Sequence, residues 1–488
     1  MKLLIPLVAC LLAPAAILNA AETKPARPNF IVILTDDQGY GDFSCNGNPI
    51  LKTPQMDRVH DEGVRFTDFH VSPTCSPTRS ALLSGRHEFK NGVTHTILER
   101  ERMSLAAVTL AQVLQSAGYA TGIFGKWHLG DEDAYQPDRR GFDEVFIHGG
   151  GGIGQTYPGS CGDVPDNKYY DPVIKHNGRF EKTSGFCTDI FTAQAMRWIA
   201  SVKGTNPFFC YIPFNAAHEP VSCPPKFKEP YVGKVPDKVA TFYGMLANID
   251  ENVGHLMAGL KQWGLDTNTL VVLMNDNGGY APACKIYNAG MKGSKATAWE
   301  GGTRAVSFWR WPGNLKPATV SQLTSAVDLF PTFAELAGAT LEGTVKAQVE
   351  GRSLMPLLRN PQSPWADRNL VTHVGRWGGM SPGAPPEKYI KENCGVRNSR
   401  FSLVRGATDW QLFDLETDPG QTNDIAVRQP DVVKQLSAAY DQWWIEVLPN
   451  LVNEDAYKTA PKVNPFKDEY WIQSGVGLTP RTNPEKSE

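Results

Sequence analysis

Two short segments of this 488-residue chain concentrate hard oxygen ligands. Asp36 and Asp37 lie in Thr-Asp-Asp-Gln-Gly, and Asp276 and Asn277 lie in Asn-Asp-Asn-Gly-Gly. Three carboxylates and one amide suit Ca²⁺ or Mg²⁺ far better than a soft metal. Each segment alone is also typical of a turn, but each directly follows an apolar, strand-like run. We therefore predict that these four residues together bind a hard divalent cation, Ca²⁺ or Mg²⁺.

Cations and candidate proton carriers occur in three further segments. Lys126 and His128 lie in Gly-Lys-Trp-His, and His218 lies in Phe-Asn-Ala-Ala-His. A lone histidine is more often a structural residue and a lone lysine is more often solvated, but these three follow strand-like runs. Lys295 lies in a glycine-rich loop, which by itself is a weak signal. The four side chains could hold an anionic substrate and move a proton.

Cys75 precedes a helix-like run in Thr-Cys-Ser-Pro-Thr-Arg. Pro77 suits the first turn of a helix, with Ser76 or Cys75 as its cap and Gly85 at its end. Cys75 is then expected where backbone N–H groups and the helix dipole favour negative charge. Arg79 lies one turn away on the same face.

Three alternatives for Cys75 follow from the residues alone. A cysteine phosphatase would need arginine six residues after the cysteine, but position 81 is Ala. The local signature of a papain-type thiol is missing. A disulfide remains open, because an exported chain can form one.

Four apolar runs must position these side chains, at residues 29–34, 119–124, 208–212 and 269–274. Helix-period segments separate them at 108–117, 188–202 and 238–263, and a further one at 326–336, which contains a proline, follows the last run. This alternation predicts an α/β fold with a large, mostly parallel sheet flanked by helices on both faces. In such sheets ligands bind beyond the carboxyl ends of the strands. If the four strands are neighbours, their polar loops converge there.

The composition changes after about residue 360. Pro, Gly and Trp increase, segments 401–405 and 409–415 are strand-like, and a helix is expected at 431–445. We predict a catalytic domain over 28–360. Residues 361–488 are predicted to form a smaller α+β subdomain that contains an antiparallel sheet and completes the substrate pocket.

The N-terminus resembles an export signal. Lys2 precedes the apolar run Leu3–Leu18, and Ala20 and Ala21 offer a cleavage point. A membrane anchor and a lipoprotein box ending at Cys10 are the alternatives, but the apolar run is short for a span and continues past the cysteine. We predict a signal peptide over 1–21 and a periplasmic or secreted protein without stable membrane insertion.

The net charge of −3 gives no case for nucleic acid as a partner. Removal of the signal leaves eight cysteines without zinc-type spacing, and their number does not specify a pairing. These eight cysteines are Cys45, Cys75, Cys161, Cys187, Cys210, Cys223, Cys284 and Cys394. No feature of the sequence indicates an oligomeric state.

The Cys75–Arg79 segment, with Ser84-Gly85-Arg86 after it, resembles the signature of the type I sulfatases of the alkaline phosphatase superfamily. Other segments agree in the same order, and the similarity spans roughly residues 28 to 445. These are Gly125–Gly130, Asn275–Gly279, Lys295 with Glu300–Arg304, and Gln411–Ala426. The resemblance implies an alkaline phosphatase-like fold and conversion of Cys75 to Cα-formylglycine by a maturation enzyme before folding.

The resemblance also assigns roles at the site. It implies that Asp36, Asp37, Asp276 and Asn277 bind Ca²⁺. It implies that Arg79 and Lys126 hold the formylglycine, that His128 assists its turnover, and that His218 and Lys295 contact the sulfate. Two positions depart from the family pattern. No proline immediately precedes His218, and Ala296 stands where glycine often follows the lysine; neither change removes a functional side chain.

The family chemistry explains why a modified cysteine is needed. One hydroxyl of the hydrated aldehyde attacks sulfur and forms a covalent sulfo-enzyme. The other hydroxyl is then deprotonated, and collapse to the aldehyde expels sulfate. A sugar alcohol also needs a general acid more than a phenol does.

We therefore predict a sulfuric ester hydrolase acting on a sulfated carbohydrate or an aryl sulfate. A phosphomonoester or phosphonate hydrolase of the same superfamily is one alternative. A non-catalytic glycan-binding protein is another, suggested by 12 Trp and 15 Tyr. Candidate substrate contacts are His95, Arg100 and the loop 149–155, with a plain surface loop as the alternative for His95 and Arg100.

Overall fold

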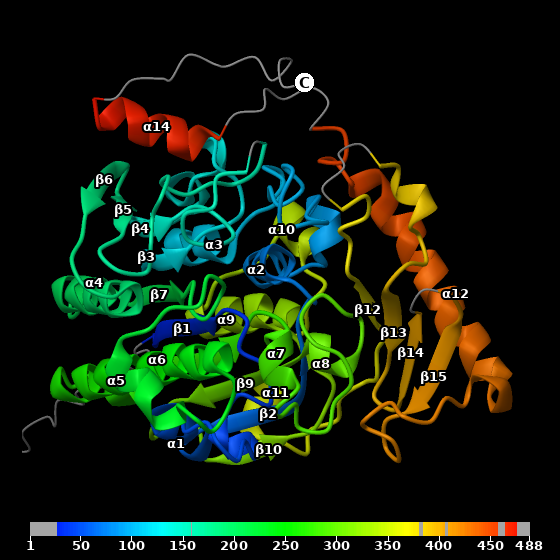
Figure 1. Ribbon diagram of the computed structural model, residues 1–488. Helices are drawn as coiled ribbons and strands as arrows, with labels where there is room; N and C mark the ends of the chain where they lie inside the picture. Colours follow the sequence, from blue (N-terminus) through cyan, green and yellow to red (C-terminus); the bar gives the residue numbers. More distant parts are fainter. Residues whose placement is uncertain (1–26, 158, 380–383, 406–407, 457–463, 476–488) are drawn as a thin grey trace, which may run out of the picture.

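The computed structural model describes residues 27–157, 159–379, 384–405, 408–456 and 464–475. The predicted signal peptide at 1–21 lies outside the described residues. No helix among the described residues is long and apolar enough to cross a membrane. Figure 1 shows a large sheet with helices around it and a smaller sheet beside it.

Four neighbouring parallel strands form the centre of an 11-stranded sheet, in the order β8, β1, β7, β3. Their bounds are β8 (Thr269–Asn275), β1 (Asn29–Thr35), β7 (Phe208–Pro213) and β3 (Ala120–Lys126). These are the four predicted strands, and every residue of β1, β7 and β8 is buried. The predicted fold class is confirmed, and the four polar loops leave the same edge of the sheet.

The outer strands extend the sheet on both sides. β2 and β9 are antiparallel to each other, β9 pairs with β8, and β4, β5 and β6 follow β3. Their bounds are β2 (Val64–His70), β4 (Glu144–His148), β5 (Val173–His176), β6 (Arg179–Lys182), β9 (Arg304–Arg310), β10 (Ala318–Val320) and β11 (Thr324–Ser325).

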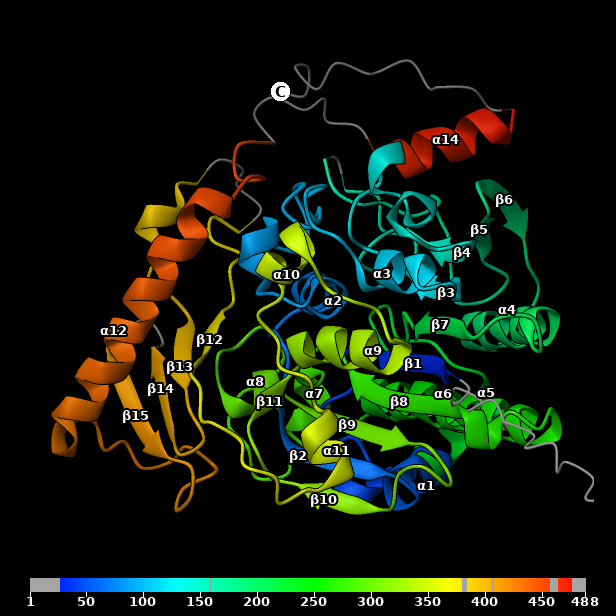
Figure 2. The same cartoon turned by 180° about the vertical axis from the view of Figure 1, so that it is seen from behind.

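Helices cover both faces of this sheet, which explains why its central strands are continuously apolar. Along β1, Phe30, Val32 and Leu34 pack into one core, while Ile31 and Ile33 pack into the other. Figures 1 and 2 show the two faces from opposite sides. The first core lies under α2 (Cys75–Ser84), α3 (Leu110–Ser116) and α9 (Leu329–Ala337), and the second lies under α1 (Pro54–Asp61), α4 (Cys187–Val202) and α6 (Asp237–Gln262).

The predicted helices at 108–117, 188–202 and 238–263 are confirmed, the last as the single helix α6. A 3₁₀ turn at Ala326–Asp328 precedes α9, so Pro331 lies in the first turn of the helix, where it costs no hydrogen bond. The short helices are α5 (Pro225–Lys228), α7 (Ala281–Cys284), α8 (Glu300–Thr303), α10 (Gly343–Gln348) and α11 (Met355–Arg359).

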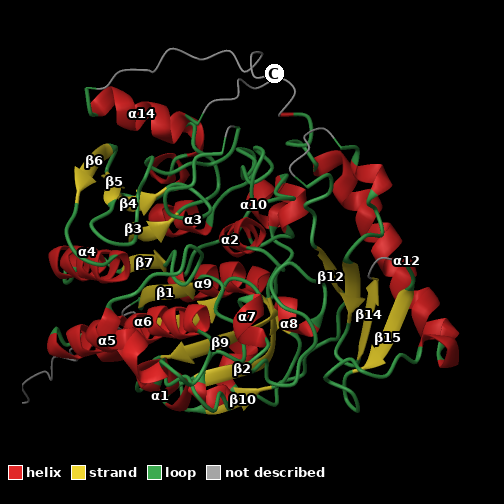
Figure 3. Ribbon diagram, viewed as in Figure 1, coloured by secondary structure: helices red, strands yellow, loops and turns green. Residues whose placement is uncertain are grey.

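The second sheet is antiparallel and has four strands, and Figure 3 shows it beside the large sheet. Its order is β12 (Leu370–His373), β13 (Cys394–Arg397), β14 (Phe401–Arg405) and β15 (Trp410–Asp414), and α12 (Pro430–Val447) packs on it. The predicted helix at 431–445 is therefore confirmed. The helix α14 (Pro465–Gln473), which the sequence analysis did not anticipate, packs instead against β6 of the large sheet.

Candidate active site

The loops after β1 and β8 bring four oxygen-bearing side chains together beneath the surface. Backbone bonds fix the loops, because the Asp36 N–H donates to Ala216 O and the Asp276 N–H donates to Thr35 O, each at 3.0 Å. The Asn277 amide donates to Asp37 Oδ1 at 3.0 Å. Asp36, Asp276 and Asn277 are fully buried, and Asp37 is 4% exposed.

Three cations pair with these carboxylates. The Arg79 guanidinium contacts Asp276 Oδ2 at 2.8 Å and Asp36 Oδ2 at 3.3 Å. Lys126 Nζ lies 2.5 Å from Asp36 Oδ2, and Lys295 Nζ lies 2.6 Å from Asp37 Oδ1. Arg79 comes from α2, Lys126 from the end of β3 and Lys295 from the loop before α8, so the fold itself balances much of the buried charge.

The carboxylates differ in their pKa values. Burial would raise the pKa of Asp37, but the charges of Lys295 and His218 outweigh it and hold that pKa well below its usual range. Burial and the charge of Asp36 raise the pKa of Asp276 to about 6, against the opposing effect of Arg79. A cation bound at this site would add positive charge beside Asp276 and would favour its ionised form.

The residues present fit a hard divalent cation. Among the described residues, Asp36 Oδ1 and Asn277 Oδ1 are buried and have no hydrogen-bond partner. Buried oxygens of this kind normally find a partner. Ligand atoms of Asp36, Asp37 and His218 lie within 4.8 Å of one another. The set of oxygen ligands suits Ca²⁺ or Mg²⁺.

Cys75 is the first residue of α2, and Gly85 (φ 69°) ends the helix as expected. The expected cap at Ser76 or Cys75 is wrong: the N-cap is Thr74, because the chain is still extended there (φ −147°, ψ 160°). Cys75 is 1% exposed and carries a free thiol. The disulfide alternative for Cys75 is therefore wrong in this structure, and the other seven cysteines named above are also free.

His128 faces Cys75, with its Nδ1 3.6 Å from the Cys75 Sγ. Its Nε2 lies 2.9 Å from Thr96 O and must donate to that carbonyl, which leaves Nδ1 as an acceptor. Burial, and then the charge of Lys126, lower the pKa of His128 well below its usual value. His128 also has a left-handed backbone (φ 59°), which is uncommon outside glycine and frequent at functional sites.

His218 and Lys295 line the same cavity as Cys75 and His128. The His218 Nδ1 donates to Glu219 O at 2.7 Å, so its Nε2 is the acceptor. Burial and the charge of Lys295 lower the pKa of His218 to about 4. Burial alone would lower the pKa of Lys295, but the negative groups around it raise it, so Lys295 stays charged.

A cavity of about 580 Å³ opens above these residues. Asp37, Cys75, His128, His218 and Lys295 line it. The sequence-predicted His95 and residues Gly151 and Gln155 of the predicted loop line it too. The sequence analysis missed several further lining residues, which no local motif marks: Thr96, Ile97, Tyr157, Glu219, Tyr280, Ala281, Ala296, Arg376 and Gly379.

Arg100, the other predicted substrate contact, does not line this cavity. Its guanidinium is buried, bonds Glu454 Oε1 at 3.0 Å and Trp377 O at 3.0 Å, and lies 4.4 Å from the Trp377 ring centroid. These contacts explain why the Arg100 guanidinium points into the protein and not into the cavity. Arg100 joins the segment after His95 to the C-terminal part of the chain.

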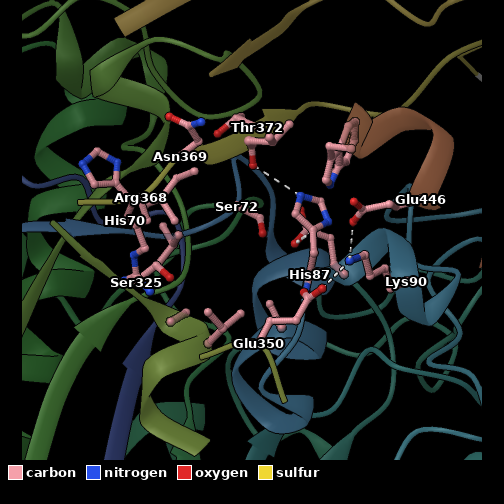
Figure 4. Close-up of a pocket in the computed structure, with 18 of the residues that line it drawn as sticks. His70, Ser72, His87, Lys90, Ser325, Glu350, Arg368, Asn369, Thr372 and Glu446 are labelled. Atoms are coloured by element: carbon pink, nitrogen blue, oxygen red, sulfur yellow. Dashed lines mark hydrogen bonds and ion pairs between the residues drawn. The ribbon is translucent and has the colours of Figure 1, made fainter. Parts of the chain in front are cut away.

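A second cavity, of about 450 Å³, lies between the two sheets and is drawn in Figure 4. Several of its charged side chains are paired: Lys90 bonds Glu350 and, at 3.1 Å, Glu446, while Arg368 bonds Asp328. Cys75 and the four oxygen ligands do not line it. The first cavity is therefore the candidate active site.

Comparisons with known proteins agree with this choice. The sulfatase family model matches residues 28–339, and the model of the C-terminal part of N-sulphoglucosamine sulphohydrolase matches residues 294–442. Arylsulfatase G of Rattus norvegicus is 32% identical, over 93% of each chain. Arylsulfatase J of Mus musculus is 29% identical, over 91% of this chain and 80% of its own. The crystal structure of Ps i-CgsB in complex with k-i-k-neocarrahexaose superposes with a TM-score of 0.75 at 26% identity, covering 92% of this chain and 98% of that one.

Proposed function

The chain belongs to the type I sulfatases of the alkaline phosphatase superfamily, and from this premise we propose that it removes sulfate from a sulfated carbohydrate by means of a formylglycine formed from Cys75. The observation that carries the proposal is the contact between the Cys75 Sγ and the His128 Nδ1, 3.6 Å apart, beside the buried carboxylates. Family membership supports sulfate ester hydrolysis. The modified residue, the metal and the substrate class are the parts that we add.

Support for the modified residue comes from sequence and burial together. The Cys-x-Pro-x-Arg segment is intact, and Cys75 is a free thiol at the N-terminus of a wholly buried helix. A maturation enzyme must therefore reach Cys75 before α2 packs. Formylglycine would supply a hydrated aldehyde as nucleophile and a route to release sulfate.

Asp36, Asp37, Asp276 and Asn277 would hold the divalent cation, for which we propose Ca²⁺. When bound, this ion supplies positive charge for the sulfuryl oxygens. The Arg79 guanidinium donates to Lys126 O at 3.0 Å and also pairs with Asp36 and Asp276. It therefore fixes the ends of β3, β1 and β8 to α2.

His128 acts as a base at residue 75. It is neutral, and its Nε2 proton is held by the Thr96 carbonyl, so its Nδ1 can accept a proton from the residue 75 side chain. The cationic Lys295 attracts a sulfate oxygen. His218 is neutral in the free protein; an anionic sulfate beside it favours its protonated form, which can protonate the leaving oxygen.

The carbohydrate substrate is supported by the cavity and by relatives. Tyr157, Tyr280 and Gln155 line the cavity and offer ring faces and hydrogen-bonding groups to a sugar. Ps i-CgsB was solved with a neocarrahexaose. A sugar alcohol is a poor leaving group and needs an acid such as His218. We also propose that residues 1–21 direct export to the periplasm or the medium.

Mass spectrometry of the peptide covering residue 75 tests the modified residue. We expect the mass of an aldehyde in place of the thiol group, and no aldehyde in Cys75→Ala. An unmodified cysteine in a protein that hydrolyses sulfate esters would overturn the formylglycine part.

Steady-state assays on defined sulfated oligosaccharides, with matched phosphate esters, test the activity. We expect faster turnover of the sulfates. Phosphate esters cleaved faster than their sulfate counterparts would favour the phosphohydrolase alternative. An intact protein that binds these glycans without cleaving them would favour the glycan-binding alternative.

A further inference from the structure

Arg376, which follows β12, reaches the cavity without a carboxylate partner. Its Nη2 donates to Thr96 Oγ1 at 3.0 Å, and its backbone N–H donates to Thr94 O at 3.1 Å. Its Nε is buried and has no hydrogen-bond partner among the described residues. Within the same part of the chain, no acidic group lies within ion-pair distance of this guanidinium. The Arg376 side chain as a whole is partly buried, and a buried guanidinium nitrogen without a hydrogen-bond partner is costly.

His95 presents a second unused donor to the same cavity. The side chain is 4% exposed, and its Nδ1 accepts from the N–H of Thr96 at 2.7 Å and of Ile97 at 3.2 Å. The proton of this imidazole must therefore lie on Nε2. That Nε2 is buried and makes no regular hydrogen bond among the residues described, although the Gly379 backbone lies close enough to oppose the lowering of the His95 pKa by burial.

Thr96 joins these donors to the catalytic residues. Its hydroxyl bonds Arg376, its carbonyl bonds the His128 Nε2, and the His128 Nδ1 faces Cys75. Lys295 and His218 lie at another part of the same cavity, beside the carboxylates. The cavity thus contains one cationic group, Lys295, beside the carboxylates, and a second one, Arg376, next to His95 and Thr96.

Among the described residues, two acidic side chains line the cavity, Asp37 and Glu219, and both are engaged, Asp37 by Lys295 at 2.6 Å. Glu219 bonds the Tyr280 hydroxyl at 3.0 Å and pairs with Lys238. A second anion near Arg376 would therefore meet two donors and no free carboxylate of the described wall.

We infer that Arg376 and His95 bind a second anionic substituent of the substrate, so that the preferred substrate is a sulfated sugar carrying another sulfate or a carboxylate. This inference rests on the proposed sulfatase function. Arg376 binds the substituent as an ion pair, and the His95 Nε2–H donates one hydrogen bond to it. Both act in substrate recognition, because among the described residues no hydrogen bond joins either of them to Cys75, whose Sγ contacts His128.

The test compares wild type, Arg376→Ala and Arg376→Lys on defined disaccharides with one sulfate, with two sulfates, or with one sulfate and one uronate carboxylate. 4-Nitrophenyl sulfate serves as a substrate with no second anion. The exposed Arg400, paired with Asp414 on the second sheet, supplies the control variant Arg400→Ala. Circular dichroism and thermal melting establish that each variant folds, and Arg376→Gln replaces Arg376→Ala if the latter does not.

We expect wild type to prefer a dianionic disaccharide over its monosulfated counterpart. Arg376→Ala should lose ~10–100-fold in kcat/KM on that substrate, the effect of a charged hydrogen bond, mainly through KM. It should lose less than ~3-fold on 4-nitrophenyl sulfate, and Arg376→Lys should recover part of the loss. The two dianionic series show whether the group is sulfate or carboxylate.

Wild type active on 4-nitrophenyl sulfate but without preference for a second anion would overturn the inference and leave the proposed function intact. An equal loss on all substrates in Arg376→Ala would do the same, because it would indicate a structural role. Wild type inactive on every sulfate ester would instead overturn the proposed function.

Discussion

The two catalytic-site histidines are held in opposite tautomers by backbone carbonyls. Thr96 O accepts a hydrogen bond from the His128 Nε2–H, whereas Glu219 O accepts one from the His218 Nδ1–H. Burial lowers both pKa values, so both rings are neutral in the free protein. The acceptor nitrogen of His128 thus faces residue 75, which suits a base there.

We predict that His128→Asn separates the first turnover from later ones. Loss of the base at residue 75 should lower steady-state kcat by ~100–10,000-fold, because release of sulfate from the enzyme needs that base. The first release of leaving group should persist. Stopped-flow measurement with 4-nitrophenyl sulfate should show one equivalent of nitrophenol per modified active site and then almost none. Equal loss of the first and later turnovers would contradict this role.

At the scale of elements, the site depends on the ends of four strands and the start of one helix. β8, β1, β7 and β3 are parallel neighbours, so their carboxyl ends present their loops together. The helix α2 places Cys75 beside those loops and is buried over its full length. The elements therefore fix the catalytic groups on rigid backbone.

We predict that Ca²⁺ stabilises this strand-end cluster as well as supporting turnover. Treatment with a chelator should abolish activity, and Ca²⁺ should restore it. In differential scanning calorimetry, Ca²⁺ at 100-fold over its Kd should stabilise the chelated protein by about 2.7 kcal/mol. Asp276→Asn should reduce that Ca²⁺-dependent rise in Tm. A Tm independent of Ca²⁺ in wild type would contradict metal binding by these residues.

The C-terminal glycine of α2 allows a second prediction at this scale. Gly85 and Gly338, at the end of α9, are both left-handed (φ 69° and 67°). A Cβ at Gly85 would lie 2.8 Å from the Phe330 Cβ, whereas a Cβ at Gly338 meets nothing within 4 Å. Gly338→Ala should cost ~1–2 kcal/mol for the backbone alone, and Gly85→Ala should cost a further ~1–3 kcal/mol for overpacking. Urea unfolding measures both, and equal costs would contradict the packing argument.

At the scale of the whole molecule, the second sheet contributes to the active site and is fixed to the first. Arg376 follows β12 and reaches the cavity. Arg397 of β13 pairs with Asp68 at 2.9 Å and with Glu300 at 3.1 Å, both in the large-sheet part. That residues 361–488 form a subdomain that completes the substrate pocket stays a prediction. The division into domains at residue 360 also stays a prediction. The helix α14, although it follows residue 360, packs against β6 of the large sheet.

We predict that two buried acids away from the cavity, Glu101 and Asp131, make a contribution to stability that is lost as pH rises above about 5. Burial raises the pKa of Glu101 from 4.5 to about 7 and that of Asp131 from 3.8 to about 8. The folded protein therefore keeps protons that the unfolded chain releases. This stability is fully present below the unfolded pKa values and is lost as pH rises through the folded ones, by up to ~1.4 kcal/mol per pH unit per group.

Urea unfolding at pH 5, 6.5 and 8 measures this dependence. The double variant Glu101→Gln/Asp131→Asn should show a flatter curve than wild type, and the exposed Glu229→Gln should follow wild type. Parallel curves for wild type and the double variant would assign the pH dependence to other groups.

Much of the site was predictable from local sequence. The continuous apolar runs of β1, β7 and β8 marked buried parallel strands, and the polar residues after them marked the edge of the sheet where ligands bind. The Cys75 segment marked the chemistry through its resemblance to a family. Residue type and short spacing specify these features because they depend on neighbouring residues in the chain.

Only the tertiary structure decided which distant groups meet. The same guanidinium chemistry is turned inward at Arg100 by Glu454 and Trp377 but left open to the cavity at Arg376. The free state of the eight described cysteines and the tautomers of His128 and His218 also depend on contacts made by folding. The sequence determined the reacting groups by their types, and packing of segments far apart in the chain determined their partners.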